Sequence, residues 1–210
     1  MATIYLIRHG EIAGNAGARL FFSGWADVPL SERGLEQARL AAKHLSGAKL
    51  KAVYSSDLQR ARRTAEEIAA PHGLQVLEDA AWREIDFGDW SGACEADLLE
   101  KWPALWRERQ ADPENVRPPQ GENLRDIWDR ARPAWQNVLS RHESSADSVA
   151  IVAHQGTIRV LLLGLLQAPL GSYRALIVRN CSVSTVAASQ SKVSITGVNF
   201  CAHLDAPLEP

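Results

Sequence analysis

Cationic and imidazole side chains suited to binding an anion occur at three points where the chain leaves a short apolar run. Arg8 and His9 end the first such run, and Arg60 lies shortly after the second. His154 ends a third run much later in the chain. Guanidinium groups present fixed forks of donors that match phosphate oxygens, and helix N-termini add backbone N–H groups. If the three points converge, two guanidiniums and two imidazoles form an anion site, most simply for a phosphate.

Continuous, β-rich apolar runs have the pattern of strands that are covered on both faces. The runs are Ile4–Ile7, Ala52–Tyr54, Val149–Ala153 and the shorter Val76–Leu77. Three further segments are β-rich and almost uncharged, and they are expected to complete the sheet, in part as antiparallel edge strands. These segments are 176–178, 183–187 and 193–200.

A helical pattern follows each of the longer early runs. One helix is expected from Ser31 to a stop near Gly47, and a second from Asp57 as N-cap to a stop before Pro71. A third apolar helix face follows Gly156. Strands that alternate with helices require right-handed crossovers. We therefore predict an α/β fold of three layers, with a mostly parallel central sheet and helices on both faces.

The segment from about residue 82 to 135 differs in composition from the rest of the chain. It holds Trp82, Trp90, Trp102, Trp106, Trp128 and Trp135, and a proline-rich loop at 111–122. We interpret it as a small cap inserted in a single domain of residues 1–210. Ligands of open α/β sheets bind beyond the carboxyl ends of the strands, so the cap is expected to determine substrate specificity. The tryptophans are expected either to pack in the core or to line the pocket.

The composition is that of an ordinary globular protein. Hydrophobic residues make up 46% and charged residues 23% of the 210 residues, and 23 Lys and Arg against 25 Asp and Glu give a net charge of −2. That balance lacks the basic excess expected of a nucleic-acid binder or a protein of anionic membrane surfaces. Three cysteines without a CxxC spacing indicate reduced thiols, and the apolar runs are too short for a signal peptide or a membrane span. We expect a cytoplasmic protein without nucleic-acid or membrane partners; a homodimer is one option for its oligomeric state.

Metal and nucleotide sites are poorer interpretations of the same residues. A pair of histidines could bind a metal ion, but neighbouring arginines repel a cation and no third ligand occurs at an HExxH-like spacing. Gly10, Gly14 and Gly17 match neither the GxxxxGK[ST] nor the GxGxxG pattern. We expect neither a metal nor a cofactor.

Leu6–Glu11, which reads LIRHGE, and the following Asn15 resemble the signature of the histidine phosphatase superfamily, in its phosphoglycerate-mutase-like branch. The resemblance continues in the family's order across about residues 4 to 160. The further blocks are 22–38, Ser55–Ala61, Trp82–Gly88, Gly121–Leu124 and Val152–Gly156.

The resemblance implies that His9 is phosphorylated during turnover and that Glu84 is the proton donor. An imidazole has an ordinary pKa of about 6.5, and neighbouring guanidiniums should disfavour its protonation further. The residues implied to bind the phosphoryl group are Arg8, Arg60, His154 and Asn15. The residues implied to contact the rest of the substrate are Ser23, Gly24 and Gln155.

The family contains both phosphatases and mutases. Mutases of this branch usually carry a longer insertion with extra basic residues, whereas Trp106–Arg109 lies in a shorter stretch with several acids. We therefore predict a metal-independent phosphatase that acts on a small phosphorylated metabolite. Asp86–Gly92 resembles the alpha-ribazole phosphate phosphatases, which makes alpha-ribazole 5′-phosphate a candidate substrate. A phosphoglycerate mutase and a phospholigand-binding protein without turnover are the alternatives.

Overall fold

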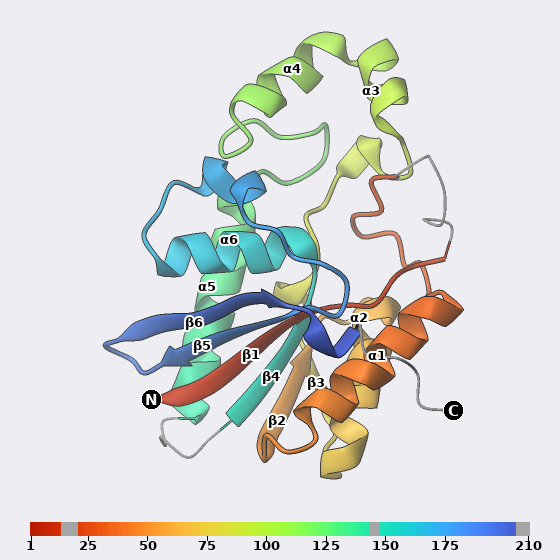
Figure 1. Cartoon of the computed structure of the whole chain (residues 1–210). Coiled ribbons are helices and arrows are strands. Elements are labelled where there is room, and N and C mark those ends of the chain that lie inside the picture. Colours follow the sequence, from red (N-terminus) through yellow and green to blue (C-terminus); the bar gives the residue numbers. More distant parts are fainter. Residues whose placement is uncertain (14–20, 143–147, 205–210) are drawn as a thin grey trace.

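The computed structural model describes residues 1–13, 21–142 and 148–204, and its centre is one six-stranded sheet (Figure 1). The strands are β1 (Ala2–Arg8), β2 (Leu50–Ser55), β3 (Val76–Glu78), β4 (Ser148–Ala153), β5 (Val183–Ala188) and β6 (Val193–Phe200). Their order across the sheet is β3-β2-β4-β1-β5-β6. The first four strands in this order run parallel, and β5 and β6 continue the sheet as antiparallel neighbours. The predicted mostly parallel sheet with antiparallel edge strands is confirmed.

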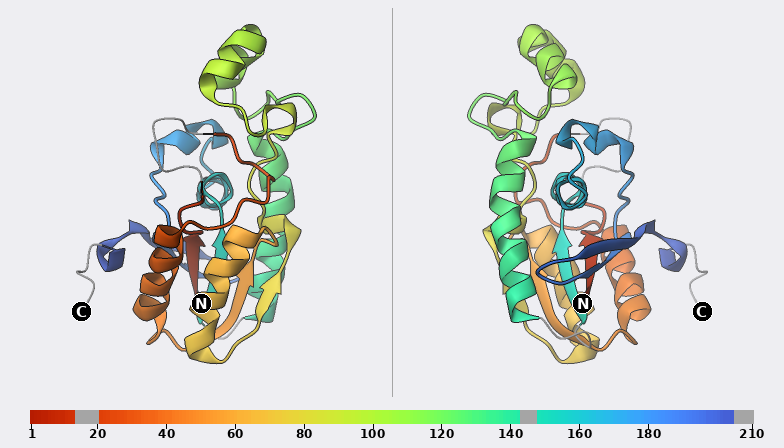
Figure 2. Two further views of the ribbon diagram at one scale, coloured as in Figure 1. Left: turned by 90° about the vertical axis from the view of Figure 1, so that its right-hand side faces the viewer. Right: turned by 90° about the vertical axis from the view of Figure 1, so that its left-hand side faces the viewer.

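Helices cover both faces of the sheet, as the views along its edge show (Figure 2). The helices α1 (Glu32–Leu45) and α2 (Gln59–Ala69) share one buried apolar cluster with Ile7 and Val152. The helices α5 (Leu124–Arg141) and α6 (Gln155–Leu165) share another with Leu6 and Ile151. Successive side chains of a strand point to opposite faces, so each buried strand supplies both clusters. Burying a side chain of this size contributes about 1.5–3 kcal/mol, which makes these two interfaces the main source of stability.

Side-chain caps fix where two of the helices begin. The Ser31 side chain accepts a hydrogen bond from Gly34 N at the start of α1, as predicted. At the start of α5, Asn123 and Asp126 form a capping box in which each side chain accepts from the other's backbone N–H. Such caps satisfy amide groups that have no partner within the helix.

The prediction that Asp57 caps α2 is wrong. The N-cap of α2 is Leu58, which has no side-chain cap. The Asp57 carboxylate instead accepts two hydrogen bonds from Arg83, at 2.7 Å and 2.5 Å. A carboxylate that can choose between backbone amides and a guanidinium fork gains more from the charged, two-pronged partner.

The prediction of a strand at 176–178 is also wrong. The chain there is irregular and follows the 3-10 helix η4 (Leu170–Ala175). The carbonyl groups of Leu176 and Val178 accept hydrogen bonds from arginine and glutamine side chains rather than from a neighbouring strand. The β-rich composition of this segment therefore does not indicate a strand. Its backbone carbonyl groups bind side chains of the candidate site and of α6 instead.

Two short helices, α3 (Glu95–Lys101) and α4 (Pro103–Ala111), lie beyond the carboxyl end of the sheet, away from the other helices (Figure 1). Trp90, Leu98 and Trp106 form a small buried cluster of their own there. In contrast, α5 packs on the sheet, although much of it falls within the segment that composition assigned to a cap. The cap at about 82–135 stays a prediction.

The remaining 3-10 helices are η1 (Ala70–His72), η2 (Ala80–Trp82), η3 (Gly88–Trp90) and η5 (Ala202–Leu204). In the described part of the chain, no helix combines the length and apolarity needed to cross a membrane.

Candidate active site

The two histidines of the site follow neighbouring parallel strands. Arg8 is paired with Ala153 at the ends of β1 and β4, so the next residues, His9 and His154, lie side by side. Their ring centroids are 4.9 Å apart, and His9 N donates a hydrogen bond of 3.0 Å to Ala153 O. The structure thus brings together two imidazoles that are 145 residues apart in the sequence, the difference between positions 154 and 9.

A hydrogen bond fixes the tautomer of His9. Its Nδ1 lies 2.6 Å from the carbonyl oxygen of Gly10. Because a carbonyl can only accept, the proton of a neutral His9 must sit on Nδ1, and Nε2 carries the lone pair. The side chain is 5% exposed and lines a cavity. His9 is therefore oriented as a nucleophile.

The surroundings of His9 keep it neutral. Burial lowers its pKa well below the usual 6.5, and the charges of Arg8 and Arg60 lower it further, although the hydrogen bond to Gly10 opposes them. Desolvation and a nearby like charge both disfavour the protonated ring. The lone pair of Nε2 is consequently available at neutral pH.

Arg60, the second residue of α2, is held by the backbone of a loop. Its side chain is fully buried, and Nη1 and Nη2 donate to Ala26 O at 2.7 Å and Gly24 O at 2.6 Å. Gly24 has a φ of +46°, a conformation that favours glycine. Gly24, predicted to contact substrate, thus holds Arg60 through its carbonyl group, whereas Ser23 lines the cavity.

Buried polar atoms without a hydrogen-bond partner gather around His9. Among the described residues, Arg8 Nε, Arg60 Nε and both ring nitrogens of His154 have none. Buried polar groups are normally hydrogen-bonded, so a cluster of exceptions calls for an acceptor that binds there. Arg8 donates through Nη1 to Val178 O at 2.8 Å, and although burial lowers its pKa to about 10, it remains charged at neutral pH. The arrangement is that of an anion site.

His154 is neutral for the same reason as His9. Burial lowers its pKa well below 6.5, and the charges of Arg60, Arg130 and Arg8 lower it further. An anion bound beside the ring would offset these charges and favour a proton on it. With an anion bound, a protonated His154 can donate a hydrogen bond to it. In the empty site, the neutral ring adds no positive charge to that of the neighbouring arginines.

Glu84 lies against the N-terminus of α6. Its carboxylate accepts hydrogen bonds from Gly156 N at 3.1 Å and 3.2 Å and from Ile85 N at 2.9 Å. A Cβ atom on Gly156 would come within 2.4 Å of Glu84 Oε1. The absence of a side chain at position 156 is thus what lets the carboxylate reach the helix end, where the helix dipole favours negative charge.

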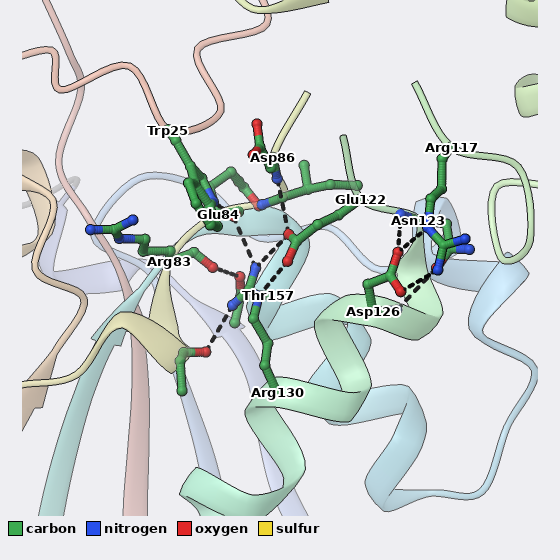
Figure 3. A network of polar contacts seen from close by, with 12 residues as sticks. Trp25, Arg83, Glu84, Asp86, Arg117, Glu122, Asn123, Asp126, Arg130 and Thr157 are labelled. Carbon is green, nitrogen blue, oxygen red and sulfur yellow. Dashed lines mark hydrogen bonds and ion pairs between the residues drawn. The ribbon is translucent and has the colours of Figure 1, made fainter. Parts of the chain in front are cut away.

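A polar network fixes the backbone of Glu84 from behind (Figure 3). The carbonyl oxygen of Glu84 accepts from Trp25 Nε1 at 2.7 Å and from Arg130 Nη2 at 2.9 Å. Arg130 also donates to Ala81 O at 2.8 Å and to both carboxylate oxygens of Glu122, at 2.9 Å and 3.0 Å. The side chains of Arg130 and Glu122 are only 18% and 17% exposed. Sequence reasoning missed Arg130, because nothing in a helical run distinguishes this arginine from surface ones.

A second set of contacts holds the residue before Glu84. The Arg83 guanidinium lies over the Trp25 ring, 4.7 Å from its centroid, and pairs with Asp57. The carbonyl oxygen of Arg83 accepts from Thr157 Oγ1 at 2.5 Å. Both networks restrict the position of the Glu84 carboxylate through its backbone.

The site opens into a cavity of about 410 Å³. Of the predicted site residues, Arg8, His9, Ser23, Glu84 and Gln155 line it, whereas Arg60 and His154 are fully buried. The Gln155 side chain donates to Val178 O at 3.2 Å. Part of the wall is aromatic and is formed by Phe22, Phe87, Trp106 and Tyr173. Asn15, predicted to bind the phosphoryl group, lies outside the described residues.

Metal ligands do not gather in the described residues, where no three His, Cys, Asp or Glu side chains lie together as a metal site would require. The imidazoles beside Arg8 and Arg60 stand in a positive field that suits an anion and opposes a cation.

Comparison with known proteins shows which family the chain resembles over nearly its whole length. The family model "Histidine phosphatase superfamily (branch 1)" matches residues 4–200. Phosphoserine phosphatase 1 of Hydrogenobacter thermophilus is 33% identical, over 97% of this chain and 95% of its own. A probable phosphoglycerate mutase GpmB of Serratia proteamaculans is 36% identical, over 99% of this chain and 97% of its own.

Solved structures resemble the whole chain as well. A mycobacterial glucosyl-3-phosphoglycerate phosphatase in complex with VO3 has a TM-score of 0.84 and 30% identity, covering 94% of this chain and 98% of its own. A putative alpha-ribazole-5′-P phosphatase of Escherichia coli has a TM-score of 0.85 and 26% identity, covering 94% of this chain and 96% of its own.

Proposed function

The chain belongs to branch 1 of the histidine phosphatase superfamily, and from this we propose that it hydrolyses a small phosphomonoester through a phosphohistidine on His9. The observation that carries the proposal is the state of His9. Its ring is neutral, the proton at Nδ1 is bound by the carbonyl oxygen of Gly10, and Nε2 therefore carries a lone pair on a ring that lies beside His154 and lines the cavity with Arg8. A nucleophile of this kind divides a slow hydrolysis into two easier displacements.

In the first step, Nε2 of His9 attacks phosphorus while the bond to the alcohol oxygen breaks. Arg8, Arg60 and His154 stabilise the charge on the phosphoryl oxygens, since fixed donors act most strongly where water is excluded. Glu84, which lines the same cavity, enters this step as the neutral acid and gives its proton to the departing alkoxide. The products are a neutral alcohol, phosphohistidine and the Glu84 carboxylate.

In the second step, water attacks the phosphohistidine and the carboxylate of Glu84 accepts the water's proton. The P–N bond breaks, and its electron pair returns to Nε2. Phosphate leaves, and His9 and Glu84 regain their starting states. No metal ion or further reactant is needed for this balance.

A mutase is the second candidate, because relatives bear both names. Hydrolysis is favoured because the segment with α3 and α4 is acidic as well as basic, with Glu95, Asp97, Glu100 and Glu108. Alpha-ribazole 5′-phosphate is one candidate substrate, supported by the Asp86–Gly92 segment and the similarity to a putative phosphatase for it. A phospholigand-binding protein without turnover is the third candidate. A cytoplasmic location is proposed on the sequence alone.

A panel of phosphomonoesters assayed with a chelator present tests the proposal. The unaltered chain should release inorganic phosphate, and His9→Ala should lose at least about 10⁴-fold in kcat. His44→Ala, an exposed histidine of α1, is the matched control and should retain activity. Equal rates in the parent and His9→Ala would contradict the mechanism. Adding 3-phosphoglycerate with its bisphosphate primer separates the mutase from the hydrolase, because only a mutase forms 2-phosphoglycerate.

A further inference from the structure

The cavity carries more positive charge than one phosphate requires. Besides Arg8, its wall contains Arg109 of α4, Arg159 of α6 and Arg174 of η4. Arg109 and Arg174 belong to elements that do not follow a strand of the sheet directly, whereas Arg159 lies in the second turn of α6, which follows β4. The sequence motifs assigned none of them a role.

Arg159 lies between the phosphate site and this outer group. Its Nε donates to Leu176 O at 2.7 Å, which leaves both terminal nitrogens of the fork without a described partner. Burial lowers its pKa, the carboxylate of Glu84 opposes that effect, and Arg174 adds to it. Arg159 therefore lies close enough to Glu84 and to Arg174 for the charges of both to affect its pKa.

Arg174 and Arg159 flank Tyr173, and Arg109 lines the same cavity. Arg174 donates from Nε to the Tyr173 hydroxyl at 3.1 Å, and its guanidinium carbon lies 5.3 Å from the ring centroid. The guanidinium carbon of Arg159 lies 5.9 Å from the same centroid. Arg109 is 5% exposed and donates from Nη1 to Pro113 O and Val116 O, at 3.2 Å each. Two guanidiniums thus flank one aromatic ring, and the third lies in the same cavity wall.

No carboxylate among the described residues forms an ion pair with these three arginines. Elsewhere most arginines are paired, as Arg33, Arg39, Arg62, Arg63, Arg83, Arg117, Arg125 and Arg130 show. The acidic side chains that line the cavity are Glu11 and Glu84. Glu11 is bound by Ser31 and Arg33, and Glu84 by the N-terminus of α6. Like charges gathered without a counter-ion are unfavourable unless an anion joins them.

We propose that Arg159 and Arg174, with Arg109 behind them, form a second oxyanion subsite for the substrate's non-reacting end. The substrate is then a phosphomonoester that carries a further anionic group, a carboxylate or a second phosphate, on a scaffold that packs on Phe22, Phe87 and Trp106. This inference rests on the proposed function for the identity of the reacting phosphate. It does not favour alpha-ribazole 5′-phosphate, which has no second anionic group.

A matched pair of ligands tests the subsite, because 3-phosphoglycerate and glycerol 3-phosphate differ only by a carboxylate in place of a hydroxymethyl group. Their dissociation constants are measured by calorimetry on the His9→Ala chain, so that turnover plays no part. We expect 3-phosphoglycerate to bind at least about tenfold more tightly, as one charged hydrogen bond provides. In the His9→Ala background, Arg174→Ala and Arg159→Lys should each reduce that preference to within about twofold. Arg179→Ala, an exposed arginine four residues after the helix η4 that does not line the cavity, should preserve it.

Propane-1,3-diol bisphosphate distinguishes the two oxyanions. If it alone binds more tightly than glycerol 3-phosphate and loses this advantage in Arg174→Ala, the subsite binds a phosphate. Equal affinity for all three ligands, or a preference that survives both substitutions, would overturn the subsite. Hydrolysis of all three ligands by the unaltered chain would leave the proposed function standing in that case. The reverse result, a preference in binding with no hydrolysis of any ligand, would refute the proposed function and support the subsite.

Discussion

The two ends of the cavity are built differently. At the phosphate end, His9 and His154 follow paired strands, and Arg60 lies in the first turn of a helix with its guanidinium held by two carbonyl groups. At the outer end, Arg174 is exposed and lies on the 3-10 helix η4. The residues proposed to react with the phosphate are thus fixed by the sheet and by the start of a helix, whereas Arg174 of the proposed subsite lies on a connecting segment, which tolerates change.

Among the substitutions that leave His9 in place, the largest effect should come from the Glu84 carboxylate. Glu84→Gln keeps the size of the side chain, and the amide oxygen can still accept hydrogen bonds from the backbone amides. The variant has no acidic proton to give to the leaving group, so kcat should fall about 10²–10⁴-fold. Because p-nitrophenol leaves without a proton, p-nitrophenyl phosphate should still phosphorylate His9 in this variant and give a burst of nitrophenol. Glu100→Gln, an exposed residue of α3, is the control. An unchanged rate with an alkyl phosphate would remove Glu84 from the mechanism.

A smaller loss should follow from moving that carboxylate. Gly156→Ala places a Cβ 2.4 Å from Glu84 Oε1, which is closer than non-bonded atoms approach, so the carboxylate must shift. A misplacement of about 1 Å costs on the order of 10²-fold in kcat, with little change in KM if the arginines hold the phosphate. Gly171→Ala is a matched control, since a Cβ there meets no atom within 4 Å. Equal kinetics of the two variants would show that the Glu84 position does not matter.

Two ion pairs in Figure 3 should differ in their contribution to stability. Arg130 is bound to Glu122 and to two carbonyl groups in a poorly exposed position, so Arg130→Met should lower the free energy of unfolding by about 2 kcal/mol. The Arg117–Asp126 pair is more exposed, with Arg117 at 56%, so Arg117→Met should change stability far less. Urea unfolding measures both. A double-mutant cycle with Glu122→Gln should give a coupling energy for Arg130, and additive effects would contradict the network.

The smallest effect concerns the pH dependence of stability. The folded chain holds the pKa values of His9 and His154 well below 6.5, so below pH 6.5 the unfolded chain binds more protons than the folded one. Stability contributed by each neutral histidine is therefore present above pH 6.5 and is lost as the pH falls. We expect each to remove about 1 kcal/mol between pH 6.5 and 5.5. His154→Asn should reduce this slope in urea titrations, and an unchanged slope would contradict the prediction.

The same contrast explains what the sequence predicts well. His9 and His154 follow apolar runs whose burial is unmistakable, and parallel pairing of those runs places both side chains at one edge of the sheet. Arg60 follows from its place near the start of a helix. The ends of such strands can thus be predicted from a local sequence pattern, and they indicate which side chains lie at the same edge of the sheet.

The rest of the site depends on contacts that a local pattern does not contain. Asp57 has the residue type of a helix cap, and only the fold brings Arg83 to it. The segment 176–178 has the composition of a strand, but its carbonyl groups are taken by Arg8 and Arg159 from distant elements. In the sequence, Arg130 and Arg174 cannot be distinguished from other surface arginines. Only the fold shows the partners of Arg130. Only the fold shows that no described carboxylate forms an ion pair with Arg174.

The most direct test of the account is to identify the residue that carries the phosphoryl group. The chain is mixed rapidly with p-nitrophenyl phosphate, quenched in alkali to preserve a P–N bond, digested, and analysed by mass spectrometry. The account predicts one acid-labile phosphoryl group on the peptide that contains His9, at Nε2 by NMR, and a larger amount in Glu84→Gln. Rapid phosphate release with no phosphorylated His9 at any time, or a phosphoryl group on another residue, would contradict it.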